Sequence, residues 1–88
     1  MTTVLEKKIK ESFPLMPRYV ASLIAEVVDI LHWKQSECIE DIEYDGLKLV
    51  RPDVWRLYFK CKKCGTEITV LYNDYYKKIY EIGYMDNI

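Results

Sequence analysis

The chain has 88 residues, of which 50% are hydrophobic and 31% charged, and its formal net charge is −1 at pH 7. This length suits a single domain over residues 1–88 with a small core, and the charge gives no overall bias toward nucleic acid or membranes. No apolar run reaches the ~20 residues that span a bilayer, and the N-terminus lacks a signal-peptide pattern. Together with an odd cysteine count, three, these features predict a cytoplasmic protein rather than a secreted disulfide scaffold.

The first part of the chain, about residues 2–34, is predicted to be helical. Thr2 or Thr3 can cap a short first helix, which Phe13-Pro14 ends. Pro17 suits the first turn of a second helix, because its missing N–H would be unpaired there anyway. Such an apolar helix is either the central helix of the core or half of a dimer contact. Apolar residues at helical spacing predict its buried stripe: Val20, Leu23, Ile24, Val27 and Leu31, widened by Val28 and Ile30.

The second part, about residues 37–84, changes to a period of two, which is typical of strands. Asp45-Gly46 stands between two such runs and predicts a hairpin with a two-residue type I′ turn. Further strands are expected over residues 54–61, 66–72 and 76–84. The sequence therefore predicts an α+β fold, with N-terminal helices packed on a four- to five-stranded antiparallel β-meander.

The segment Cys61-Lys62-Lys63-Cys64-Gly65 falls between two of the expected strands. Two thiolates two residues apart, at a turn closed by glycine, suit one corner of a tetrahedral zinc site. Gly65 can take the positive φ that turns backbone N–H groups toward the sulfurs. The two lysines would offset the negative charge of a zinc–thiolate centre and lower the pKa values of the thiols.

Residues 56–70, which include this segment, resemble one knuckle of a zinc ribbon. The resemblance implies a structural zinc ion and, by analogy with that family, a role in nucleic-acid or transcription machinery. A full ribbon carries a second knuckle on another hairpin, and this chain has no second Cys-x-x-Cys pair.

Three ways of completing the cysteine site remain open at this stage. In the first, Cys38 and His32 join Cys61 and Cys64 to give a Cys3His zinc site within one chain. In the second, two protomers each donate Cys61 and Cys64 to a shared ion. In the third there is no metal, and the two cysteines are reduced or disulfide-bonded. A thioredoxin-like redox role is disfavoured, because a β-rich run rather than a helix follows the motif.

Basic and aromatic side chains suggest a second kind of site on the same hairpin. Rings interleaved with cations can stack single-stranded bases and follow a phosphate backbone. The alternative is that tyrosine simply favours strands, with its ring buried and its hydroxyl wet. The candidate nucleic-acid-binding residues are Arg56, Tyr58, Lys60, Lys62 and Lys63.

No catalytic constellation can be assembled from the residues, so the chain is predicted not to be an enzyme. The favoured function is a small regulatory or protein-interaction module with a Cys-stapled hairpin, whose partner is another protein or a second copy. The alternative is a zinc-knuckle nucleic-acid-binding protein that uses the basic hairpin. The few amides and abundant charge resemble small proteins of hyperthermophilic archaea and their viruses, which would place a viral protein inside the host cell.

Overall fold

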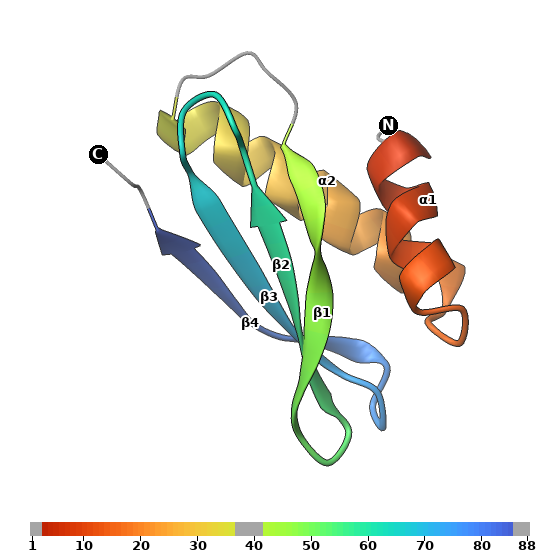
Figure 1. Cartoon of the computed structure of the whole chain (residues 1–88). Helices are drawn as coiled ribbons and strands as arrows, with labels where there is room; N and C mark the ends of the chain where they lie inside the picture. Colours follow the sequence, from red (N-terminus) through yellow and green to blue (C-terminus); the bar gives the residue numbers. More distant parts are fainter. Residues whose placement is uncertain (1–2, 37–41, 86–88) are drawn as a thin grey trace.

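The computed structural model describes residues 3–36 and 42–85, which form two helices and a four-stranded antiparallel sheet (Figure 1). The strand order β1-β2-β3-β4 follows the chain, so each strand pairs with the next. The predicted α+β meander is therefore confirmed, with four strands. The elements are α1 (Thr3–Ser12), α2 (Arg18–Ser36), β1 (Glu43–Arg51), β2 (Val54–Lys60), β3 (Glu67–Asn73) and β4 (Lys78–Met85).

The two helices are separated by a short turn that proline defines. The last bond of α1 runs from the Phe13 N–H to the Ile9 carbonyl over 2.9 Å. Pro17 lies one residue before α2, where its carbonyl accepts bonds from the N–H groups of Val20 and Ala21 at 3.0 and 3.1 Å. Pro17 is thus the N-cap residue of α2 rather than part of its first turn. Its carbonyl accepts the first hydrogen bonds of the helix, and no hydrogen bond is lost because proline has no N–H.

The buried side of α2 is rotated from the stripe that the sequence predicted. Leu23 and Ile30, both expected in the core, are 49% and 44% exposed. The buried side includes two alanines, Ala21 and Ala25, which are fully buried. Hydrophobic periodicity favoured the larger apolar residues and so did not predict that these alanines would face the core. The buried side consists of Val20, Ala21, Ile24, Ala25, Val28 and His32.

The predicted hairpin at Asp45-Gly46 is wrong, because both residues lie inside β1. Only Gly46 of the pair has a positive φ, 116°, whereas a type I′ turn needs positive φ at both central residues. The pairing with β2 shifts register between Tyr44 and Gly46, so the glycine accommodates a β-bulge. The chain reverses instead at Pro52-Asp53, where Asp53 has φ 65°.

The core lies between the helices and one face of the sheet. The predicted alternation of β2 and β3 is confirmed, since Leu57, Phe59, Ile68 and Val70 are at most 1% exposed. Phe13, at the end of α1, packs edge-on against the rings of Trp55 and Tyr72, with centroids 5.3 and 5.7 Å apart. Each such large apolar side chain contributes about 1.5–3 kcal/mol when buried. In the described parts of the chain, no helix is long and apolar enough to cross a membrane.

Candidate metal centre

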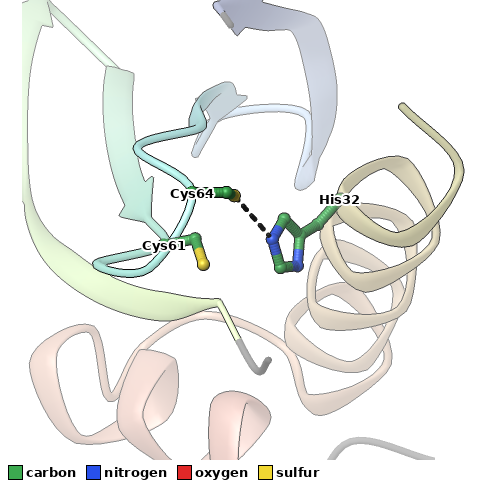
Figure 2. Close-up of side chains that lie close together, drawn as sticks. All are labelled: His32, Cys61 and Cys64. Carbon is green, nitrogen blue, oxygen red and sulfur yellow. Dashed lines mark hydrogen bonds between the residues drawn. The ribbon is translucent and has the colours of Figure 1, made fainter. Parts of the chain in front are cut away.

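Three potential metal ligands from distant parts of the sequence meet at one end of the sheet. His32 comes from the C-terminal half of α2, and Cys61 and Cys64 come from the turn between β2 and β3 (Figure 2). One ligand atom of each residue lies within 4.8 Å of the other two. Cys64 Sγ lies 3.4 Å from His32 Nε2.

The turn that carries the cysteines is shaped by its own backbone. The Cys61 N–H donates to the Thr66 carbonyl at 3.0 Å, and the Gly65 N–H donates back to the Cys61 carbonyl at 2.9 Å. Gly65 has φ 78°, the left-handed conformation that glycine adopts without steric cost. The predicted positive φ of this glycine is confirmed, although its own N–H donates to a carbonyl rather than to a sulfur. The turn holds both sulfurs on the side that faces α2 (Figure 2).

The histidine reaches the site because it lies on the core side of its helix. His32 follows Val28 by four residues, so the two share a face of α2. Its side chain is only 2% exposed, which rules out a surface position. Because a buried imidazole needs polar partners, its contact with Cys64 explains how a histidine is accommodated among apolar neighbours.

Hydrogen bonding makes Cys64 an unusually acidic thiol. Its Sγ lies 3.1 Å from Oγ1 of Thr66, a side chain that is fully buried. When the sulfur is ionised, the Thr66 hydroxyl can donate to it. This hydroxyl lowers the pKa of Cys64 most, burial opposes it, and the Thr66 N–H, His32 and Cys61 add further lowering; the pKa falls from 9.0 to about 5. These hydrogen bonds, rather than the neighbouring lysine charges, cause the shift.

The set of ligand atoms suits a thiophilic metal ion. Tetrahedral zinc with Zn–S and Zn–N bonds of ~2.3 and ~2.0–2.1 Å separates a sulfur from a nitrogen by about 3.6 Å. The 3.4 Å between Cys64 Sγ and His32 Nε2 is close to that value, and the other two separations are no longer than 4.8 Å. His32, Cys61 and Cys64 therefore sit close enough to bind a metal. They form no disulfide between the two sulfurs.

Of the four predicted metal ligands, the structure brings three together. The fourth, Cys38, lies outside the described residues. The signal that sequence reasoning missed is Thr66, whose hydroxyl and backbone both engage the cysteine turn. Its place directly after Cys-x-x-Cys-Gly could have suggested a hydrogen-bond donor for the second sulfur.

Three of the five predicted nucleic-acid-binding residues lie on the opposite face of the sheet from the metal ligands. Arg56, Tyr58 and Lys60 alternate with the buried residues of β2 and so occupy the sheet face opposite the helices. Lys48 of β1 lies on the same face, because the register of the sheet pairs it with Arg56.

The lysines of the turn are placed differently. Lys62 lies 3.8 Å from the carboxylate of Glu43, an exposed pair that contributes little to stability. Lys63 is also exposed and occupies the same turn.

The fold and this cluster define a small α+β protein with a Cys2His set of candidate metal ligands. Searches of protein-family models, curated proteins and solved structures found no match to the chain.

Proposed function

We propose that this protein is a small zinc-binding interaction module that catalyses no reaction of its own. One observation carries the proposal: an imidazole nitrogen and two cysteine sulfurs, from residues 32, 61 and 64, lie within 4.8 Å of one another. Cysteine and histidine are the usual ligands of structural zinc, and closed sites of this kind stabilise folds rather than catalyse reactions.

The ion would join two parts of the fold that are held together mainly by apolar packing. His32 belongs to α2 and both cysteines to the β2–β3 turn, so a shared ion would fasten the helix to the sheet. A small domain gains proportionally from such a crosslink, because its core supplies only a few kcal/mol of net stability. Zinc binding would then contribute directly to folding free energy.

A fourth ligand is needed for a closed tetrahedral site. Cys38 is the candidate within the chain, six positions after His32 in the sequence. A second protomer is the other candidate. The two differ in stoichiometry: closure by Cys38 requires one zinc per chain, whereas an ion shared through Cys61 and Cys64 of two protomers requires one zinc per two chains.

Elemental analysis with a native mass measurement tests the proposal. We expect bound zinc that is lost in Cys61→Ser and Cys64→Ser and weakened in His32→Gln. Loss in Cys38→Ser as well would identify the fourth ligand within the chain. Cobalt replacement would add thiolate-to-metal charge-transfer absorption as an independent readout. A protein that is purified and refolded with zinc, yet holds none, would refute the metal site.

The outward face of α2 supports the interaction part of the proposal. Four large side chains on this face are 44–70% exposed: Tyr19, Leu23, Ile30 and Trp33. They extend over about 21 Å at 1.5 Å per residue, on either side of the exposed Glu26 at the centre of the same face, and large exposed apolar side chains gathered on one helix face are typical of interaction surfaces. The occupant we propose is α2 of a second copy, because an isologous contact needs one self-complementary patch of matching length.

Nucleic-acid binding through the open sheet face is the second candidate function. The observation that favours it is the shared position of Arg56, Tyr58 and Lys60, with Lys48 beside them. Binding should weaken steeply with salt if phosphate contacts drive it. A Lys62→Glu/Lys63→Glu variant should reduce both the affinity and the salt dependence. Absence of salt-dependent binding to oligonucleotides at low ionic strength would exclude this function.

A further inference from the structure

The end of the sheet away from the cysteines contains a small open cleft of about 240 Å3. It is lined by Asn73, Tyr76, Lys78, Ile79 and Tyr80, from the β3–β4 turn and the start of β4. The β1–β2 turn lies beside it, because the Asp74 N–H donates to the Asp53 carbonyl at 2.7 Å. Two reversals of the chain thus meet at this end.

Exposed aromatic rings are concentrated around the cleft. Tyr75, Tyr76 and Tyr80 are 71%, 65% and 56% exposed. The rings of Tyr75 and Tyr76 meet edge to face, with centroids 4.9 Å apart. Three rings within six residues, each more than half exposed, form an aromatic surface that the core does not use.

The turn that presents these rings is fixed by side-chain contacts. Asn73 Oδ1 accepts the N–H groups of Tyr75 and Tyr76 at 2.9 and 3.0 Å. Lys77, which has φ 57°, is held by an ion pair with Asp74 at 2.8 Å. A ring on a preformed turn loses less entropy when it binds a ligand.

Cations lie over the rings on both sides of the cleft. The guanidinium carbon of Arg51 is 5.5 Å from the centre of the Tyr80 ring, and its Nη2 donates to the Tyr80 hydroxyl at 3.3 Å. Lys78 Nζ is 5.7 Å from the centre of the Tyr76 ring. Arg51 ends β1 and Tyr80 lies in β4, the opposite edge strand, so these two long side chains meet across the end of the sheet.

We propose that this cleft binds an unstacked base of a single-stranded nucleic acid. Tyr76 and Tyr80 would stack on the base, and Arg51 and Lys78 would contact the flanking phosphates, since stacking platforms combined with cations bind single strands. The cleft is smaller than the ~300–1,000 Å3 of typical ligand pockets, which suits one base. Lysine is depleted in protein–protein interfaces, so Lys78 within the aromatic cluster favours nucleic acid over a protein partner.

This site is distinct from both the metal centre and the open face of β2. It shares no residue with either, so its test is independent of bound zinc. Anisotropy of labelled ten-nucleotide deoxythymidine and uridine strands should report binding at low ionic strength. We expect Tyr76→Ala and Tyr80→Ala each to reduce affinity about tenfold, within the range for loss of one stacked ring. The Tyr→Phe changes at both positions should retain most of it.

Two matched controls separate this cleft from other surfaces. Lys8→Gln removes an exposed cation on α1 and so matches Lys78→Gln in charge, and Tyr58→Ala removes the ring of the open sheet face. Neither should change the affinity if the cleft is the site. Arg51→Gln and Lys78→Gln should each weaken binding and reduce its salt dependence. The proposal fails if the strands do not bind, if Tyr58→Ala alone abolishes binding, or if Tyr76→Ala/Tyr80→Ala binds like wild type.

Discussion

The two ends of the sheet use polar and aromatic side chains in opposite ways. At the β2–β3 turn, His32, Cys61 and Thr66 are at most 2% exposed and converge inward. At the other end, Tyr76 and Tyr80 are more than half exposed and are accompanied by cations. Buried, convergent ligand atoms are suited to holding an ion that stabilises the fold, whereas exposed rings and cations are suited to a partner from solution. A domain this small can separate stability from recognition by placing them at opposite ends.

The largest expected effect on stability comes from a substitution in α2, the helix that carries His32. Val28→Asp, one turn before His32, would bury an unpaired charge at a fully buried position and should cost several kcal/mol, enough to unfold the domain. Leu23→Asp, at a 49% exposed position, should leave the protein folded. Circular dichroism and thermal melting would compare the two variants.

The same pair of variants tests the outward face of α2. Light scattering should show a dimeric wild type and a monomeric Leu23→Asp protein. A wild type that is monomeric at high concentration would exclude the second copy as occupant. Unfolding of Leu23→Asp would instead mean that this face belongs to the core, as the hydrophobic periodicity alone suggested.

Removal of the metal should give the next largest change in stability. This change should depend on the cysteine residues and not on the tyrosines at the other end of the sheet. Chelation of the zinc-loaded protein is expected to lower the melting temperature by about 10 °C or more, since 1 kcal/mol corresponds to about 4–8 °C in a domain of this size. Cys61→Ser should melt at the lower temperature with or without chelator. Tyr80→Ala, as the control, should respond to chelation like wild type. Equal melting temperatures with and without chelator would show that metal bound at the cysteine end does not stabilise the fold.

The acidity of Cys64 predicts a pH dependence of the metal-free protein. Its pKa of about 5 in the folded state lies below the ordinary 9.0. Ionisation of Cys64 therefore stabilises the fold fully above about pH 9, and this contribution is lost as the pH falls toward 5. Denaturant titrations of chelator-treated protein at pH 5, 7 and 9 should show the trend, and Cys64→Ser should reduce it. If the free energy of unfolding of Cys64→Ser depends on pH as strongly as that of wild type, the pH dependence comes from other groups.

The smallest effect is expected at Tyr72, on the core side between the two ends. Its side chain is fully buried, and its hydroxyl makes no well-formed hydrogen bond among the described residues, although the Asp74 carboxylate is close enough to interact with it. Burial, and then the negative charge of Asp74, raise the pKa of this hydroxyl to about 12. Tyr72→Phe should leave stability unchanged or raise it by up to about 1 kcal/mol, because it removes an unsatisfied polar group. A clear loss of stability in denaturant titrations would mean that the hydroxyl is satisfied in solution.

Local pattern determined most of the fold and part of the metal site. The alternation of Leu57 and Phe59 in β2, and of Ile68 and Val70 in β3, predicted which side chains face the core, because strand geometry alternates faces whatever lies opposite. The Cys61–Cys64 turn closed by Gly65 was also predictable, since its conformation depends on neighbouring residues only. The chain reversal at Pro52-Asp53 also has a local cause, because proline and aspartate both favour turns.

Tertiary packing decided the features on which the proposed functions rest. Asp45-Gly46 has the composition of a hairpin turn, yet pairing with β2 makes it a bulge within one strand. The rotation of α2, which buries His32 against the cysteines and exposes Leu23, depends on side chains from the sheet that a single-helix period does not contain. The side chains of Arg51 and Tyr80 meet although they come from opposite edge strands. Such contacts form between residues that are far apart in the sequence, and local sequence patterns do not predict which of these residues will meet in the folded chain.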